Sequence, residues 1–512
     1  MKRILVALLL LRAFVLVFFV SKSGIGLGPD EAQYWTWSQL LDFGYYSKPP
    51  GIAWQIWLGT SLLGNTEWGV RLGSLVMGSL LPFAVYGIAR ASQLTRLAAF
   101  WAAVVMAFSP MGVIASLLAI TDVGLVLCWA CVCWLISRAL SKDKPLPFTA
   151  IGLFIAVGAL FKWLIFVFWI GIVVLMIARR EKRIISLFWG FIVSLLGLLP
   201  SVIWNMNHEW ATFKHVEATI INKSIVEPGT TGLMEGNFLD FLGAQAALLS
   251  PIVFIILIFS SIALIRRWQQ VPVAVRFQGV WSLCLIIVYL GLAVFKKLQG
   301  NWVDYAYPGA CVLIAWYAVD YCRRGLRWVV LGVFTSFFLV AVVLMIPFVQ
   351  SRNVWMKHQV PYRSSPFKHN VGWLTLKKAL THAGYDPTKH FLVSDKYQTT
   401  SILSFYGPGQ HRAYFLNLNG IRHNQFSYWP GLAQEQRGKT GYFVFVENAP
   451  PNSEQVEKSS ADYLEKLKVY FRNVKEEHKQ TLFYSYGKPV KTAVIFRCEG
   501  YNGREEPATN LY

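Results

Sequence analysis

The 512-residue sequence contains little charge for its length. Only 15% of its residues are charged, whereas 55% are hydrophobic and 15% are aromatic, and the mean hydropathy is +0.44. Soluble domains usually carry about 25% charged residues, so this composition excludes a single water-soluble domain as the default. The aromatic content and the recurrent apolar runs also exclude a disordered chain, because disordered chains are poor in both.

Cysteine is also scarce, and only one of the seven cysteines, Cys498, lies beyond residue 350. That part of the chain therefore cannot hold an internal disulfide. Cys128, Cys131 and Cys133 lie within one apolar run without polar or histidine neighbours, so we interpret them as buried apolar side chains rather than metal ligands. No Gly-rich loop follows a strand and opens a helix, which excludes the usual site for a soluble nucleotide.

Apolar runs are frequent in residues 1–350, and about 20 apolar residues suffice for a helix to cross a bilayer. We expect about eleven spans there, so the predicted fold class is a polytopic α-helical membrane protein. The predicted spans are 4–20, 68–89, 97–118, 120–137, 148–161, 163–178, 184–204, 239–265, 277–295, 302–321 and 328–349. The fifth and sixth are short and can form one bent or re-entrant unit. The first lacks a cleavage site, so we interpret it as a retained span rather than a signal peptide.

Residues 351–512 have the composition of an ordinary soluble domain. Short runs rich in β-branched and aromatic residues predict strands, and longer runs between them predict helices. The strands are expected at 390–393, 413–416, 441–446 and 493–496, and the helices at 374–383 and 461–469. Because the two types alternate, we predict a small soluble α/β domain at the C-terminal end.

Basic residues recur at every second connection between the predicted spans. They are Lys2, Arg3, Arg90, Arg96, Arg138, Lys142, Lys144, Arg179, Arg180, Lys182, Arg183, Arg266, Arg267, Arg276, Arg323, Arg324 and Arg327. The positive-inside rule makes this face and the N-terminus cytoplasmic, and with eleven spans the C-terminal domain is periplasmic. The net charge of +21 is then mostly a topology signal. We therefore expect membrane lipids, and not nucleic acid, among the partners.

The first predicted outer loop, residues 21–67, carries the densest set of chemistry-bearing residues. Asp30 and Glu31 follow Gly28-Pro29 at a predicted helix start, and Lys48 precedes two prolines that fix its backbone. A carboxylate there can take a proton from an acceptor hydroxyl, and the lysine can neutralise a leaving lipid phosphate. The alternative is a solvated acidic cap and a lysine that reaches out of the bilayer.

Three further charged residues stand in apolar company at the predicted outer face. Arg71 can pair with Glu67 on one helix face or can face the site. Asp122 follows Thr121, which predicts either a capped helix start or a second carboxylate in the site. Lys162 can reach toward solvent or can contact a phosphate. The residues alone leave each of these alternatives open.

Taken in order, these motifs resemble those of bacterial ArnT-like membrane glycosyltransferases, which are related to the protein mannosyltransferases and form part of glycosyltransferase family 39 with the C-type fold. The segments that carry the resemblance are 28–34, 44–51, 67–72, 121–122, 161–163, 200–210, 241–251, 301–308, 394–406 and 424–431. The resemblance implies a polyprenyl-phosphate-linked sugar as donor, inversion by direct displacement, and a periplasmic lipid or envelope-glycan acceptor. The implied enzyme is a hexosyl- or pentosyltransferase of the bacterial inner membrane.

The resemblance also implies roles for particular residues. Asp30 corresponds to the catalytic carboxylate, with Glu31 and Asp122 as further acids, and Lys48 corresponds to a contact of the donor phosphate. We add Arg71 and Lys162 as candidates for binding that phosphate. Direct displacement requires no cofactor, and two acids such as Asp30 and Glu31 do not by themselves make a divalent-cation site.

Two functions of other classes stay open at this point. A lipid-linked-sugar flippase or transporter would need a polar path to the cytoplasmic face, whereas the sequence concentrates its acids at the outer face. The absence of an internal repeat of 20–50 residues also disfavours a secondary transporter. A non-catalytic envelope scaffold would not need so many spans to anchor one domain.

Overall fold

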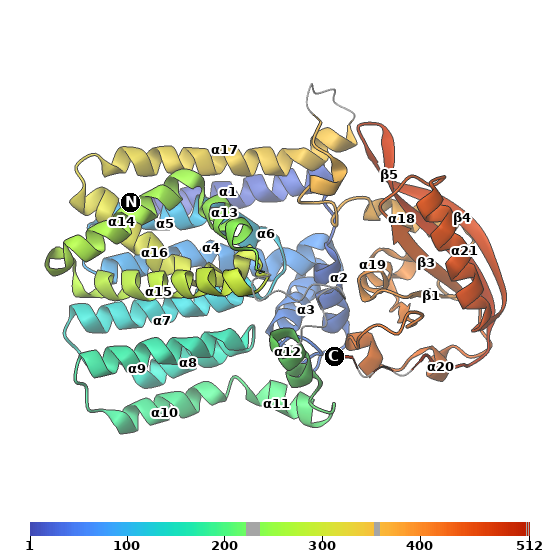
Figure 1. Cartoon of the computed structure of the whole chain (residues 1–512), viewed down its shortest axis with the longest axis horizontal. Helices are drawn as coiled ribbons and strands as arrows, with labels where there is room; N and C mark the ends of the chain where they lie inside the picture. The colour runs from blue at the N-terminus through green and yellow to red at the C-terminus, as the bar shows by residue number, and fades with distance from the viewer. Residues whose placement is uncertain (222–235, 353–358, 508, 510) are drawn as a thin grey trace.

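The computed structural model of the chain describes residues 1–221, 236–352, 359–507, 509 and 511–512. Long helices lie side by side in one half of the molecule, and a small domain built on a sheet forms the other half (Figure 1). Helices α2 (Pro29–Gln39), α3 (Gly51–Leu63) and α12 (Ala211–Ile221) lie where the two halves meet. Of the predicted outer connection 205–238, residues 222–235 lie outside the described residues.

All eleven apolar runs predicted from the sequence are helical over most of their length. The helices are α1 (Lys2–Ser23), α4 (Glu67–Ala91), α5 (Arg96–Phe108), α6 (Pro110–Leu117), α7 (Asp122–Ser141), α8 (Phe148–Ala159), η1 (Trp163–Val167), α9 (Phe168–Ala178), α10 (Ile184–Leu195), α11 (Leu199–Met206), α13 (Phe238–Leu249), α14 (Pro251–Arg266), α15 (Val273–Phe295), η4 (Gly300–Ala306), α16 (Tyr307–Ala315), η5 (Trp316–Tyr321) and α17 (Gly325–Ser351). Among the described residues, five helices are long and apolar enough to cross a membrane, or up to eight if each bent pair is one span. The chain is thus a multi-pass membrane protein, and the count of eleven crossings stays a prediction.

Three of the predicted spans are bent where a proline begins a new helix. The bends measure 60° between α5 and α6, 50° between α10 and α11, and 101° between α13 and α14. Pro110, Pro200 and Pro251 lie in the first turn of the second helix of each pair, where the missing N–H of proline is not needed. Beyond the bend at Pro110, Val113 and Leu117 of α6 lie in one buried cluster with Ile25 of the first outer loop.

The C-terminal domain is built on a five-stranded mixed sheet in the order β2-β1-β3-β5-β4. Its elements are η6 (Tyr362–Ser364), η7 (Trp373–Thr375), α18 (Leu376–His382), β1 (Phe391–Ser394), α19 (Tyr397–Tyr406), η8 (Pro408–Gln410), β2 (Tyr414–Phe415), η9 (Gln425–Tyr428), α20 (Leu432–Glu435), β3 (Gly441–Glu447), α21 (Glu454–Lys468), β4 (Phe471–Ser485) and β5 (Lys488–Tyr501). Strand β1 pairs in parallel with β2 and β3, whereas β5 pairs antiparallel with β3 and β4. The prediction of an α/β domain is confirmed, but β4 and α19 were not predicted.

The first outer loop and the C-terminal domain share one hydrophobic core. The ring of Trp35 meets that of Phe405 edge-on, with 5.0 Å between the centroids, and both side chains are buried. The backbone N–H of Leu27 donates to the Tyr406 hydroxyl at 2.6 Å. Because these contacts cross between the halves, the loop is held by both of them rather than by the membrane helices alone.

The two ends of the helical half differ in charge. The α7–α8 and α9–α10 connections, which carry six of the basic residues listed above, lie at the end far from the sheet domain, as does the N-terminus (Figure 1). The C-terminal domain lies at the opposite end. This arrangement is the one that the positive-inside rule predicts for a domain on the outer face.

We therefore predict that the two ends of the helical half are reached from opposite sides of the membrane. A protease site inserted at Tyr486-Gly487, between β4 and β5, should be cleaved in intact spheroplasts, and a site inserted at residues 142–146 should be protected. Inverted vesicles should give the reverse pattern. Cleavage of both sites from the same side would contradict the predicted topology.

Candidate active site

The first outer loop presents its two acids from the start of α2. Pro29 is the first residue of the helix, and the backbone N–H of Gly28 donates to Oε2 of Glu31 at 2.9 Å. Carboxylates in the first turn are favoured by the helix dipole. The two neighbours then diverge, because consecutive helical residues point about 100° apart. Glu31 is only 3% exposed, whereas Asp30 remains exposed.

Glu31 is held by Arg71 of α4 in a buried two-pronged ion pair. Nε and Nη2 of Arg71 lie 2.8 Å from Oε1 and Oε2 of Glu31, and the Arg71 side chain is fully buried. The backbone N–H of Ala119, between α6 and α7, donates to Oε1 at 3.0 Å. Arg71 also donates to the Gly26 carbonyl at 2.8 Å. The pair therefore fastens the outer loop to α4 and to the start of α7.

This geometry fits neither of the two alternatives for Arg71. Its guanidinium pairs with Glu31 and not with Glu67, and its side chain is fully buried rather than facing the site. Glu67 instead accepts a hydrogen bond from the Tyr406 hydroxyl at 3.1 Å. With their charged atoms turned toward each other, Glu31 and Arg71 are arranged to position the loop rather than to touch a substrate.

Lys48 lies in a tight turn. The two prolines that follow it connect this turn to the start of α3. The backbones of Tyr45 and Lys48 bond to each other, with N···O distances of 3.1 and 3.4 Å. Gly51 then approaches Leu160 so closely that its N–H donates to the Leu160 carbonyl at 2.7 Å. A Cβ at position 51 would lie 2.6 Å from that carbonyl oxygen, so only glycine permits this contact. The contact brings the Lys48 turn next to the Lys162 turn.

Lys162 and Asp122 meet on the other side of this contact. A Cβ at Gly124 would lie 2.4 Å from the Phe161 ring, so the absence of a side chain there lets the turn pack against α7. Nζ of Lys162 then lies 2.6 Å from Oδ1 of Asp122, whose Oδ2 accepts from Nδ2 of Asn301 at 2.9 Å. Lys162 is therefore engaged by a carboxylate and not simply extended toward solvent.

The helix-cap interpretation of Thr121 is wrong. Asp122 is the first residue of α7, but the Thr121 side chain makes no capping hydrogen bond and its backbone is helical. The Asp122 carboxylate, only 6% exposed, points to Lys162 and Asn301. This placement agrees with the alternative of a second carboxylate in the site.

Asp30 and Lys48 influence each other electrostatically. Partial burial raises the pKa of Asp30 above its usual value, and the positive charge of Lys48 offsets part of that rise. Burial lowers the pKa of Lys48, and the charge of Lys162 acts in the same direction, whereas Asp122 and Asp30 raise it. Asp30 is thus open to a ligand but surrounded by enough protein to lose hydration. A carboxylate in this state is a better proton acceptor than a fully hydrated one.

The structure adds residues that sequence reasoning missed. Asn301 binds Asp122, and Asp304 lies within electrostatic reach of Asp122 and Lys162. Asp304 is 3% exposed, and its Oδ1 has no hydrogen-bond partner among the described residues. Both residues stand at the polar start of an apolar run, which is a signal that was available in the sequence.

The C-terminal domain also reaches the site. Tyr397, the first residue of α19, lies within electrostatic reach of Asp30, and so does His369. Asp30, Lys48, Asp122 and Lys162 therefore lie close to one another at the junction of the two halves. The structure brings these four predicted residues together, and it turns Glu31 and Arg71 away into their own pair.

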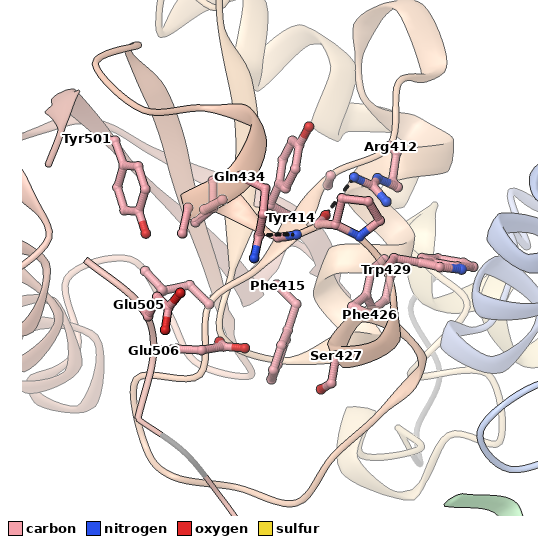
Figure 2. A pocket seen from close by; sticks show the side chains of 16 residues that line it. Arg412, Tyr414, Phe415, Phe426, Ser427, Trp429, Gln434, Tyr501, Glu505 and Glu506 are labelled. Carbon is pink, nitrogen blue, oxygen red and sulfur yellow. Dashed lines mark hydrogen bonds between the residues drawn. The ribbon is translucent and has the colours of Figure 1, made fainter. Parts of the chain in front are cut away.

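A separate pocket of about 230 Å³ lies within the C-terminal domain (Figure 2). Its lining includes Arg412, Trp429 and Gln434, and two hydrogen bonds of 2.8 Å hold its wall together, from Arg412 to the Pro430 carbonyl and from the Gly431 N–H to Gln434. Its lining includes none of the six predicted site residues. We therefore treat it as distinct from the charged cluster.

Within the described parts of the chain, no three His, Cys, Asp or Glu side chains gather in a way that could hold a metal ion. Asp30 and Glu31, the two acids considered for a cation, point apart because Glu31 is bound by Arg71.

We predict that the Glu31–Arg71 pair stabilises the fold rather than the reaction. Arg71→Met leaves a buried carboxylate unpaired, and breaking such a pair costs about 3–5 kcal/mol. The thermal midpoint of the detergent-purified protein should fall clearly, whereas Lys48→Met, which breaks no buried ion pair, should leave it close to wild type. Equal midpoints for the two variants would contradict this assignment.

Comparisons with known proteins find similar sequences for part of the chain and similar folds for nearly all of it. Residues 47–204 match the family described as dolichyl-phosphate-mannose-protein mannosyltransferase. The lipid A galacturonosyltransferase RgtD of Rhizobium johnstonii is 26% identical over 303 residues, which cover 58% of this chain and 62% of that protein. The undecaprenyl phosphate-alpha-4-amino-4-deoxy-L-arabinose arabinosyl transferase of Pseudomonas paraeruginosa is 35% identical over 95 residues, or 16% of this chain and 17% of the relative. The chain thus matches less than two thirds of the length of either relative.

Two solved structures share the architecture over nearly the whole chain. The apo structure of ArnT from Cupriavidus metallidurans superposes with a TM-score of 0.62 at 16% identity, covering 96% of this chain and 97% of that one. The same protein bound to undecaprenyl phosphate gives a TM-score of 0.60 at 15% identity, with the same coverage. The chain therefore has the fold of ArnT, and its residues 47–204 resemble the protein mannosyltransferase family, in line with the resemblance that its motifs predicted.

Proposed function

We propose that the chain is a glycosyltransferase that moves a sugar from a polyprenyl-phosphate carrier to a lipid or envelope-glycan acceptor. The observation that carries the proposal is the placement of Asp30 and Lys48 at the junction of the two halves, each altering the pKa of the other. Two relatives are named as transferases that act on lipid A or with an undecaprenyl-phosphate-linked sugar, and ArnT was solved with undecaprenyl phosphate. These names support the same donor and acceptor classes here.

Asp30 acts as the base in this proposal. Its carboxylate takes the proton from the acceptor hydroxyl, whose oxygen forms a bond to the anomeric carbon. The bond between that carbon and the carrier phosphate breaks at the same time, and its electron pair stays with the phosphate. The configuration at the anomeric carbon is inverted. A raised pKa brings Asp30 closer to the pH at which it works, which favours proton transfer.

Lys48 stabilises the leaving phosphate. Charge builds up on the phosphate oxygens as the sugar departs, and an ammonium in partly dehydrated surroundings stabilises that charge more than it would in water. Lys162 lies near Lys48 but is already bound by Asp122, so it supplies less uncompensated charge. We assign Asp122, Asn301 and Lys162 to shaping the site around the phosphate.

Glu31 and Arg71 are positioning residues in this scheme. Their ion pair holds the turn from which Asp30 projects, and it connects that turn to the start of α7, where Asp122 lies. The transferred unit is a hexose or a pentose, and transfer takes place at the periplasmic face of the inner membrane. Mass spectrometry of envelope lipids and glycans, with and without the chain, will name the sugar and the acceptor together.

We predict that the roles of Asp30 and Lys48 can be distinguished by experiment. Asp30→Asn removes the base and should lower transfer about 10²–10⁴-fold while binding of undecaprenyl phosphate to the purified protein is retained. Lys48→Met should weaken that binding as well as transfer. The measurements are transfer in membranes, with the donor and acceptor named by mass spectrometry, and carrier binding in detergent. Wild-type transfer by both variants at normal membrane levels would remove the proposal.

The pH dependence of transfer gives an independent check. Transfer requires Asp30 without its proton, so activity should be lost as the pH falls through a pKa above the usual carboxylate range. Lys48→Met removes a charge that lowers this pKa, so the acidic limb of kcat/KM should move to higher pH. Lys48→Arg, which keeps the charge, should leave the limb in place. A limb that stays fixed in Lys48→Met would contradict the coupling of the two residues.

A further inference from the structure

A second hollow lies at the opposite end of the helical half, far from the C-terminal domain. It has a volume of about 820 Å³ and lies among the start of α1, the end of α4, the start of α5 and the end of α7. Two aromatic residues, Tyr86 and Trp134, form part of its wall. We call this hollow the basic pocket because of its charged lining residues, which are Lys2, Arg3, Arg90, Arg96, Arg138 and Lys142.

The charge of the basic pocket is uncompensated. No acid is among its lining residues, and within the described chain none of its six cations forms an ion pair. Lys2 lies 5.9 Å from the centre of the Tyr86 ring, and Arg138 lies 4.9 Å from that of Trp134. These contacts hold Lys2 and Arg138 at the wall of the hollow. The like charges of the lining repel one another, and a bound anion would reduce that repulsion.

The positive-inside rule explains basic residues on this face but not their gathering around one hollow. Arg266 and Arg267, at the end of α14, belong to the same set of basic connections and do not line it. Arg179 of that set is paired with Asp143. The basic pocket is therefore a local concentration of charge within a face that is basic throughout.

The surroundings favour an anion that carries an apolar tail. Ile4 and Leu11 of α1 and Leu80 of α4 are exposed by 51%, 58% and 48%, so apolar surface continues along the helices that border the hollow. Tyr86 and Trp134 have the amphipathic rings that are common where hydrocarbon meets headgroups. Basic pockets between helices on the cytoplasmic side bind the headgroups of anionic lipids.

We propose that the basic pocket binds the phosphate headgroup of an anionic glycerophospholipid from the leaflet opposite the candidate active site. Helix α7 connects the two sites, with Asp122 at its first residue and Arg138 in its last turn. At 1.5 Å per residue they lie about 24 Å apart along the helix, so one phosphate cannot serve both. A lipid held here joins the beginning of α1 to α4, α5 and α7, and so steadies the helix from which Asp122 projects. The proposal does not rest on the chemistry assigned to Asp30.

The test compares two double variants of the full-length protein in detergent. Arg90→Gln with Arg138→Gln removes two charges from the basic pocket, and Arg266→Gln with Arg267→Gln removes two from the same face outside it. Binding of phosphatidylglycerol, measured by native mass spectrometry and by the rise in thermal midpoint, should weaken about 30-fold in the first variant alone. Phosphatidylcholine should bind weakly to all three proteins.

Each other outcome overturns the proposal. Equal weakening in both variants would show a general effect of charge on this face. Equal protection by inorganic phosphate would show a site for a soluble anion. Displacement of phosphatidylglycerol by undecaprenyl phosphate at much lower concentration, in a manner lost in the first variant, would assign the pocket to the carrier instead. If the first variant does not fold, Lys142→Gln with Arg96→Gln provides the same comparison.

Discussion

The candidate site depends on one buried ion pair. Taking a carboxylate and a guanidinium out of water is unfavourable unless each is fully bonded, and here the two prongs of Glu31 and Arg71 are supplemented by the backbones of Gly28, Ala119 and Gly26. Because Glu31 must point inward to meet Arg71, its neighbour Asp30 is turned about 100° away along α2. The orientation of Asp30 is thus a geometric consequence of a pair that does not itself face the ligand.

Two close approaches at glycine bring the remaining charges to the same place. Gly51 lets the turn after Lys48 touch the Leu160 carbonyl, and Gly124 lets the Phe161 ring lie against α7. The segment 160–162 is therefore packed between the first outer loop and α7, and Lys162 of this segment pairs with Asp122 of α7. Any side chain at either glycine would push this turn outward and separate Lys48 from the Lys162–Asp122 pair.

Sequence reasoning found what local patterns encode and missed what depends on distant partners. Each apolar run predicted from the sequence is helical over most of its length, and Gly28-Pro29 and the double proline predicted the start of α2 and the fixed turn at Lys48. Strand β4 was missed because its residues 472–480 are charged or polar except for Val474, as suits an edge strand that pairs only with β5. Helix α19 was missed because its buried residues include Thr400, Ser401 and Ser404. The partner of Arg71 lies 40 residues away along the chain, so no spacing rule could select it over Glu67.

The three cations proposed as contacts of the donor phosphate differ in how far their charge is already compensated, and this difference assigns their roles. Arg71 is fully buried and bonded to Glu31 on both prongs, so no further anion can reach its charge. Lys162 is partly exposed and shares Asp122 with Asn301, so Asp122 already neutralises part of the Lys162 charge before a ligand binds. Lys48 makes no ion pair with any described residue, and burial together with Lys162 works against its positive charge. An incoming phosphate would relieve that disadvantage at Lys48 more than at either other cation, so the contact with a leaving phosphate falls to Lys48.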